Sequence, residues 1–301
     1  MIPDLNPNSL VIFYFVAKEK SLSLAADRVH LTQPAVSYHI QSLEEYAGVK
    51  LLESKKRQIV LTPHGEELYK YAEAVYRQLV DADLFVRSIK ESSLRVGIAS
   101  MYNPTVGPVI KKMYEQYPGV KLTVKSGDAI EMVQEVVDSQ LDLAVVPQFD
   151  YDSGKMSSTV VSPPQKIVCF ASNNQFIPRE PLSWRDLCNY PLVVGPEDSI
   201  IRKLIFDKIK SQGLEMQRSV TEVNSTEWCK TLVEDGKGIS FTVLGDIEKQ
   251  VAEGRLKIVQ LEEDLYLTAA VVMRSGMFVN PAVKEFIAMV KQAFGYSDTE
   301  N

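Results

Sequence analysis

Histidine is scarce in this sequence of 301 residues, and none occurs in its larger part. The three copies are His30, His39 and His64. The chain beyond them has no imidazole that could act as the base of a Ser-His or Cys-His nucleophile. This absence excludes that kind of covalent catalysis from most of the molecule.

Cysteine is equally rare, with three copies in the whole chain. Cys169, Cys188 and Cys229 are an odd number, and their spacing matches neither a disulfide framework nor a paired-ligand zinc site. We therefore expect three small buried side chains, with no metal and no cofactor.

Long apolar runs and an excess of positive charge are also missing. The longest apolar stretches, such as the one through residues 192–194, stop far short of the roughly 20 residues that span a bilayer. Asp4, Asn6 and Asn8 stand where a secretory signal would be basic and then apolar, so we expect a cytoplasmic protein with no membrane partner. The 33 Lys and Arg against 39 Asp and Glu give a net charge of −6, which does not indicate a nucleic-acid binder. Whether the chain binds nucleic acid must therefore be judged from where its charges lie along the sequence.

Residues 10 to 47 predict three short helices, because apolar residues recur there at helical spacing. Ser21 and Thr32 stand at the N-cap positions of the second and third helices, and Gly48 can end the third. Only residues 30–32 separate these two helices, which is the connection length of a helix-turn-helix. The apolar faces are Leu10, Phe13, Val16 and Ala17, then Leu22, Ala25, Ala26 and Val29, then Val36, Ile40, Leu43 and Ala47.

The outward face of the third helix carries no full charge. Short amides and hydroxyls can donate to and accept from base edges in a major groove, so this face is typical of a recognition helix. The alternative is a polar face that touches only water. The face consists of Gln33, Pro34, Ser37, Tyr38, His39 and Gln41.

A basic hairpin is predicted next, with strands at 49–52 and 58–61 flanking Lys55, Lys56 and Arg57. Such a wing would set three cations against DNA phosphates. The alternative is a solvated turn. Together with the helix caps, the predicted DNA contacts are Ser21, Thr32, Gln33, Pro34, Ser37, Tyr38, His39, Gln41, Lys55, Lys56 and Arg57.

A set of residues at fixed spacing runs through this segment: Leu10, Phe13, Val16-Ala17, Ser21, Ala25-Ala26, Thr32-Gln33-Pro34-Ala35-Val36-Ser37, Ile40, Leu43-Glu44, Gly48, Leu51-Leu52, Leu61-Thr62 and Gly65. This set resembles the LysR-type transcriptional regulators over the whole winged helix-turn-helix. The resemblance implies sequence-specific binding to double-stranded promoter DNA. The family commonly has Phe and Arg where residues 52–54 stand here, and often Arg in place of Tyr38 or Gln41, so phosphate contacts are expected to shift to the basic tip.

One long helix is predicted from Pro63 to about Ser92, with Thr62 as its N-cap. Its apolar residues alternate spacings of four and three, which is the heptad pattern of a coiled coil and predicts a second copy of the chain. The alternative is packing on the chain's own second domain. The predicted dimerisation seam is Leu68, Ala72, Val75, Leu79, Ala82, Val86 and Ile89.

The rest of the chain alternates apolar strands with helical stretches, which predicts two α/β lobes. The C-terminal segment is expected to return from the second lobe to the first. The first set is 94–99, 109–117, 120–125, 130–139 and 141–146. The second set is 167–171, 192–194, 200–212, 220–223, 227–235 and 239–242, followed by a strand at 265–272 and a helix at 281–294.

The stretches 127–128, 141–145 and 236–239 stand where LysR-type regulators have similar ones, in a domain similar to a periplasmic solute-binding protein. The resemblance implies an α/β fold with a winged helix-turn-helix, a coiled-coil linker helix and a two-lobed effector domain. It also implies homodimers joined into a tetramer, and RNA polymerase is a further candidate partner. The expected boundaries are 1–62 for the winged domain, 63–93 for the linker and 94–301 for the effector domain, with lobe I at 94–163 and 268–301 and lobe II at 164–267.

Small molecules bind α/β sheets at the carboxyl ends of strands, so a small-molecule effector of unknown identity is expected between the lobes. Asp128 departs from the family, which often has Ser or Thr there to bind an effector carboxylate. Either Asp128 caps its helix through the amide of residue 130 or 131, or the effector is neutral or cationic at that end. The candidate effector residues are Ser100, Met101, Gly127, Asp128, Pro147, Pro196 and Ser199.

Two other classes of function compete with the regulator. An enzyme on a two-lobed domain would need downstream histidine, a phosphate loop or paired carboxylates, and the sequence offers none of these. A solute-binding protein for a transporter would need export and would leave the winged domain and the heptads unexplained. We therefore predict a DNA-binding transcriptional regulator and not an enzyme.

Overall fold

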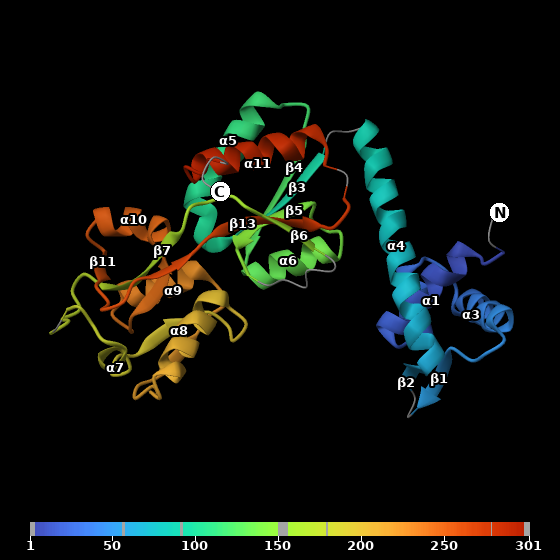
Figure 1. The fold of residues 1–301 in the computed structure, drawn as a ribbon, viewed down its shortest axis with the longest axis horizontal. Helices are drawn as coiled ribbons and strands as arrows, with labels where there is room; N and C mark the ends of the chain where they lie inside the picture. Colours follow the sequence, from blue (N-terminus) through green and yellow to red (C-terminus); the bar gives the residue numbers. More distant parts are fainter. Residues whose placement is uncertain are drawn as a thin grey trace. The chain divides into compact units, whose positions relative to one another are not determined.

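The structure, a computed structural model, divides into two compact units, Met1–Arg87 and Ser88–Asn301 (Figure 1). The described residues are 4–55, 58–90, 93–149, 156–178, 180–277 and 279–297.

Three helices form the start of the first unit, as predicted. They are α1 (Pro7–Glu19), α2 (Leu22–Arg28) and α3 (Gln33–Ala47). The side chains of Ser21 and Thr32 accept the amides of Leu24 and Ala35, so both predicted N-caps are confirmed. Gly48 ends α3 in the left-handed region at φ 69°, where glycine carries no steric penalty.

The wing consists of β1 (Leu52–Lys55) and β2 (Gln58–Leu61), which pair antiparallel from Leu52 opposite Leu61. The predicted first strand at 49–52 is wrong. The amides of Leu51 and Leu52 donate to the Glu44 carboxylate at 2.9 and 3.2 Å, so this stretch is held to α3 and pairing starts later. Lys56, Arg57 and the side chain of Lys55 lie outside the described residues.

The linker helix α4 (Pro63–Lys90) begins where the sequence predicts. Thr62 accepts the amide of Gly65 at 3.0 Å and donates to the Lys50 carbonyl at 2.8 Å. A Cβ on Gly65 would lie 2.1 Å from the Leu51 carbonyl oxygen, so only glycine lets the helix pass this close to the wing. The predicted last residues of the helix, 91 and 92, lie outside the described ones.

The predicted dimerisation seam has two different halves. Ala72 is 0% exposed in the single chain, and Leu68 and Val75 pack beside it against the core of the first unit. The assignment of Ala72 to a second copy of the chain is therefore corrected, because helix periodicity identifies an apolar face but not what covers it. Leu68 and Val75 are half-buried and stay predicted dimer contacts. Leu79 and Val86 are 48% and 54% exposed, and Ala82 is exposed as well. The side chain of Ile89 lies outside the described residues.

An aromatic cluster holds the first half of α4 on α1. The ring of Tyr14 stacks on Tyr69 and Tyr76 at centroid distances of 5.6 and 4.8 Å, and Phe15 meets Tyr76 edge-on at 5.0 Å. Aromatic pairs of this geometry contribute beyond their buried area. The start of the linker is therefore part of the folded winged unit.

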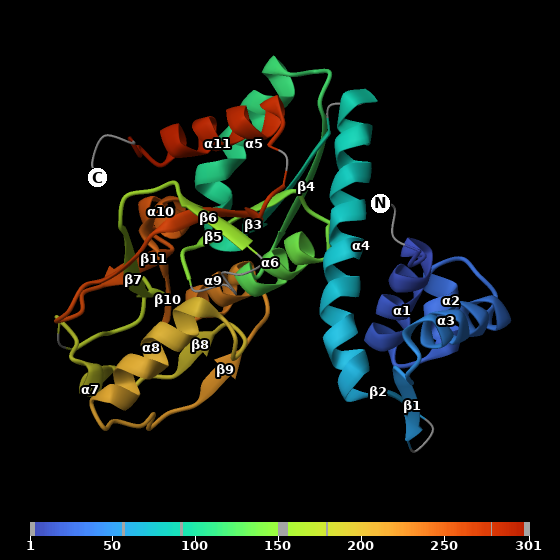
Figure 2. The same ribbon diagram turned by 45° about the vertical axis from the view of Figure 1, so that its right-hand side comes forward.

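In the second unit, lobe I is a five-stranded sheet in the order β4-β3-β5-β13-β6. β3 pairs parallel with β4 and β5, and β13 runs antiparallel to β5 and β6. The predicted return of the C-terminal segment to the first lobe is therefore confirmed. Helices α5 and α11 cover one face and α6 the other (Figures 1 and 2). The strands are β3 (Ser93–Ala99), β4 (Lys121–Gly127), β5 (Leu143–Pro147), β6 (Met156–Val160) and β13 (Ala269–Arg274), and the helices are α5 (Asn103–Gln116), α6 (Ala129–Val137) and α11 (Pro281–Ala293).

Lobe II is built around β7, which pairs antiparallel with β10, β11 and β12, while β8 and β9 form a parallel pair beside β10. An apolar cluster between β7, α9 and α10 includes Val168, Phe170 and Ile247. The strands are β7 (Gln165–Ser172), β8 (Leu192–Val194), β9 (Val220–Glu222), β10 (Ser240–Val243), β11 (Leu256–Val259) and β12 (Leu265–Leu267), and the helices are α7 (Trp184–Leu187), α8 (Ile200–Ser211), α9 (Thr226–Glu234) and α10 (Leu244–Ala252).

Several element predictions for the second unit are corrected. The single strand expected at 265–272 is two strands, because the chain passes from the lobe II sheet to the lobe I sheet at Thr268, whose hydroxyl donates to Gln148 at 2.6 Å. Helix α5 begins at Asn103 rather than 109, since the turn Ser100–Tyr102 leads directly into it and Pro108 is accommodated inside. Four further elements, β6, β11, α7 and α10, were not predicted from the sequence. Across the described ranges, no helix combines the length and apolar character needed to cross a bilayer.

Candidate DNA-binding surface and ligand cavity

The predicted recognition helix α3 presents a polar face and buries an apolar one. Val36, Ile40 and Leu43 are buried in the first unit. On the other side Gln33, Pro34 and Gln41 are exposed, Ser37 is half-buried, and Tyr38 is 70% exposed. These side chains are accessible to a nucleic acid without any change in the fold.

Other predicted DNA contacts already have partners inside the unit. His39 is half-buried, and its Nδ1 lies 3.1 Å from the hydroxyl of buried Ser9 on α1. The Gln41 amide donates to Glu45 at 2.9 Å, which leaves its second N–H and its carbonyl oxygen for other partners. Ser21 and Thr32 use their hydroxyl oxygens as helix caps.

Glu44 fixes the wing relative to α3. Besides the two wing amides, its carboxylate accepts a hydrogen bond from Lys50 Nζ at 2.5 Å. Burial acts to raise the pKa of Glu44, but the hydrogen bonds from Lys50 and the two amides outweigh it and hold the pKa below 4.5. A groove between α3 and the wing is lined by Ser37, Gln41, Glu45 and Glu53 among others. Three carboxylates against the one ammonium of Lys50 give the groove a net negative charge that disfavours a phosphate there. The amino-terminal half of α3 carries no full charge.

The second unit contains a cavity of about 80 Å³ where the two lobes meet. Lobe I contributes the ends of β3 and β4, and lobe II contributes the starts of α8, α9 and β10. The structure thus brings together six of the seven predicted effector residues. Pro147 is not in the lining; it ends β5 and lies opposite Ala269 of β13. The predicted residues that line it are Ser100, Met101, Gly127, Asp128, Pro196 and Ser199.

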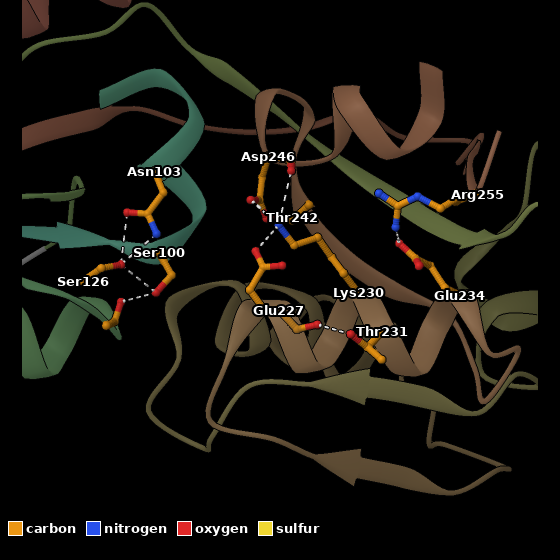
Figure 3. A network of polar contacts seen from close by, with 11 residues as sticks. Ser100, Asn103, Ser126, Glu227, Lys230, Thr231, Glu234, Thr242, Asp246 and Arg255 are labelled. Atoms are coloured by element: carbon orange, nitrogen blue, oxygen red, sulfur yellow. Dashed lines mark hydrogen bonds and ion pairs between the residues drawn. The ribbon is translucent and has the colours of Figure 1, made fainter. Parts of the chain in front are cut away.

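On the lobe I side, small polar groups bind one another. The hydroxyls of Ser100 and Ser126 lie 3.3 Å apart, and Asn103 Nδ2 donates to Ser126 at 2.8 Å (Figure 3). Asp128 Oδ1 accepts the amide of Ile130 at 2.8 Å, so Asp128 is the N-cap of α6. The capping alternative for Asp128 is confirmed.

On the lobe II side, a buried ion pair lies behind the cavity wall. Lys230 on α9 bonds Asp246 on α10 at 3.0 Å and Glu227 at 2.6 Å, and Thr242, which lines the cavity, donates to Asp246 at 2.9 Å (Figure 3). Burial acts to lower the pKa of Lys230, but its two carboxylate partners outweigh this and raise it above 10.5. Burial raises the pKa of Asp246, which has one cation and is repelled by Glu227. The pair ties α9 to α10 and holds the wall in place.

The three cysteines are buried and free, as predicted. Cys229 lines the cavity, and burial raises its pKa to about 11. Burial also raises the pKa of Cys169 and of Cys188. Because the thiolate is the reactive form, these thiols are poor nucleophiles at neutral pH.

The sequence analysis missed most of the lobe II lining. Isolated polar residues on helices and loops give no local signal, because the lining is assembled from segments far apart in the chain. The run of polar residues after β9 could have been noticed as a helix start facing a strand end. The missed residues are Arg202, Asn224, Ser225, Thr226, Cys229, Ser240 and Thr242.

Comparison with known proteins identifies this combination of a helix-turn-helix and a two-lobed binding domain. The model of the LysR substrate binding domain matches residues 89–295, and that of the bacterial regulatory helix-turn-helix proteins of the lysR family matches residues 7–66. The chain therefore belongs to the LysR family of transcriptional regulators. It is a DNA-binding regulator with an effector-binding domain, not an enzyme.

Relatives of similar length carry matching descriptions. The HTH-type transcriptional regulator CbbR of Rhodospirillum rubrum is 27% identical over 290 residues, which cover 94% of each chain. The RuBisCO operon transcriptional regulator of Allochromatium vinosum is 25% identical over 285 residues, 92% of each chain. The LysR family regulator HinK from Pseudomonas aeruginosa has the same fold, with a TM-score of 0.58 at 21% identity over 97% of this chain and 99% of that one.

Proposed function

We propose that this regulator binds promoter DNA as a homodimer and that a small molecule in the cavity between its lobes controls that binding. The observation that carries the proposal is the cavity itself, which joins strand ends of lobe I to helix starts of lobe II. A ligand there contacts both lobes at once and can bias their arrangement. The chain would act in the cytoplasm, where its DNA lies.

Base contacts are assigned to the amino-terminal half of α3, through Gln33, Ser37 and Tyr38, because these side chains are uncharged and accessible. Lys55, Lys56 and Arg57 are proposed as phosphate contacts from the sequence. The exposed second half of the linker seam, from Leu79 onward, is the proposed dimer contact. Two dimers joined as a tetramer, and contact with RNA polymerase, are the further steps that the family resemblance implies.

The DNA-reading role is tested with the full-length chain. A preferred site is first selected from random-sequence duplexes, and the affinity of Gln33→Ala is then measured on that site and on random DNA. We expect a loss of about 1–3 kcal/mol on the selected site only, since a base contact discriminates and a phosphate contact does not. Gln78→Ala, an exposed glutamine on α4, is the matched control. An equal loss on both DNAs would remove the base-reading role of Gln33.

A further inference from the structure

The cavity lining contains one formal charge of each sign, on opposite lobes. Within the part of the chain that the structure describes, Asp128 is its only anion and Arg202 its only cation. Asp128 belongs to lobe I, between β4 and α6, and Arg202 lies in the first turn of α8 in lobe II. The remaining polar lining consists of neutral hydroxyl, amide and thiol side chains.

Contacts within the protein fix the position of Arg202 and leave some of its N–H donors for a ligand. Its Nη1 donates to the Gly195 carbonyl at 2.9 Å and to Glu222 at 2.5 Å, and the guanidinium carbon lies 5.5 Å from the centre of the Phe206 ring. A guanidinium has five N–H groups. Among the described residues, no hydrogen bond from Nε or Nη2 occurs, so the edge that matches a carboxylate in bidentate geometry is uncommitted.

The helix N-termini around the cavity add to the difference in charge between the two lobes. Ser199 and Ser225, the N-cap residues of α8 and α9, line the cavity and make no side-chain capping bond, so the positive ends of two helix dipoles lie at the lobe II wall. In lobe I the corresponding amides of α6 already have an anion, because Asp128 caps that helix. Lobe II therefore offers N–H donors to an anionic group beside the ion pair that Arg202 already forms with Glu222, whereas Asp128 of lobe I repels such a group.

Asp128 has capacity for a second contact. Its Oδ1 accepts the Ile130 amide, and no hydrogen bond to Oδ2 occurs among the described residues. A ligand carboxylate placed beside it would meet like charge. A ligand ammonium would instead gain a charge-assisted hydrogen bond.

We propose that the effector is a small zwitterion of the amino-acid class, with its carboxylate on Arg202 and its ammonium group on Asp128. This inference rests on the proposed function of the cavity as the effector site. It reverses the polarity that the family resemblance implies for lobe I, where a hydroxyl in place of Asp128 would bind a carboxylate. Because Asp128 and Arg202 belong to different lobes, a molecule that carries both charges bridges the lobes.

The first experiment measures the melting temperature of the full-length protein with each of the twenty common L-amino acids. Binding to the native state raises the melting temperature by linkage. For any amino acid that does so, calorimetry compares it with its analogues that lack the amino group or the carboxylate. We expect one or more amino acids to bind, and each truncated analogue to bind roughly tenfold or more weakly, as for loss of a charge-assisted hydrogen bond.

Two variants separate the two ends of the ligand. Arg202→Met keeps an unbranched apolar stem and removes the guanidinium, so it should weaken the amino acid roughly tenfold or more but leave the amine analogue unchanged. Asp128→Asn keeps the helix cap, so it should weaken the amino acid and leave the deaminated acid bound as well as before or better. Arg185→Met, an exposed arginine of α7 outside the cavity, is the control and should bind like wild type. A purely structural role for either residue would weaken all ligands together.

The outcomes distinguish this inference from the proposed function. A deproteinised bacterial extract is tested in parallel by the same melting assay. If the extract stabilises the protein while every amino acid fails, the zwitterion is overturned and the effector cavity stands. If neither has an effect, both are overturned. Binding of an amino acid that is unchanged in Arg202→Met and Asp128→Asn would also overturn the assignment.

Discussion

The two units of the molecule place their functional side chains differently. In the first, Gln33 and Tyr38 project from an exposed helix face, and the core lies on the opposite side of the same helix. In the second, the functional groups line a cavity, and Thr242 joins that cavity directly to a buried ion pair. Substitutions of the functional side chains in the first unit can therefore leave its stability unchanged. In the second unit, the groups that line the cavity also contribute to stability.

The largest expected effect is a loss of stability in the second unit. Lys230→Met leaves the carboxylate of Asp246, whose side chain is 1% exposed, without its buried cation. Removing one partner of a buried pair costs about 3–5 kcal/mol of stability. We expect that loss in chemical denaturation of the second unit, with binding to selected DNA by the first unit retained.

The double variant Lys230→Met with Asp246→Leu is the control for this prediction. It removes both charges, and apolar replacement of a whole buried pair is often neutral. Most of the lost stability should return. If the double variant is as unstable as the single one, the damage arises from packing and not from the unpaired charge.

A smaller effect is expected on the exposed half of the linker helix. Leu79→Asp places a charge in the proposed dimer contact and should weaken the dimer by about 2 kcal/mol or more, because a desolvated charge has no partner there. Sedimentation over a range of concentrations measures the change. Gln78→Asp introduces the same charge on the neighbouring exposed position outside the seam and should leave the dimer intact. Equal dissociation by both variants would point to net charge rather than to the seam.

The smallest effect concerns the pH dependence of the first unit. The folded-state pKa of Glu44 is below 4.5, so its contribution to stability is present above that value and is lost as the pH falls through the lower, folded-state pKa. Acid denaturation of the wing should therefore be less steep in Glu44→Gln, which cannot titrate. Glu45→Gln, exposed on the same helix, should keep the wild-type pH profile. A wild-type profile in both variants would contradict the assigned role of Glu44.

The sequence predicted the parts of the structure that depend on near neighbours. The caps at Ser21 and Thr32 and the stop at Gly48 were correct because each acts within a few residues of its own position. The first wing strand was misplaced because Glu44 captures the amides of Leu51 and Leu52, an interaction that apolar alternation does not reveal.

Interactions between distant segments account for the other errors. The residues around Thr268 look like one apolar strand in the sequence, although the two sides of Thr268 belong to different sheets. Lobe I effector residues such as Ser100 could be predicted, because they follow strands at a parallel sheet edge. Arg202 was not predicted although Ser199 at the start of the same helix was, because nothing in the local sequence shows that an arginine of the first turn lines the cavity.

The burial of Ala72 beneath the winged unit has a consequence for protein engineering. Chimeric regulators are made by splicing the DNA-binding part of one chain to the sensory part of another. A junction placed at the start of α4 would strip Ala72, Tyr69 and Tyr76 from the recognition module and replace them with foreign side chains. A junction after Arg87, where the compact unit ends, keeps that module whole. The junction in such a chimera should therefore lie after Arg87 rather than at the first residue of α4.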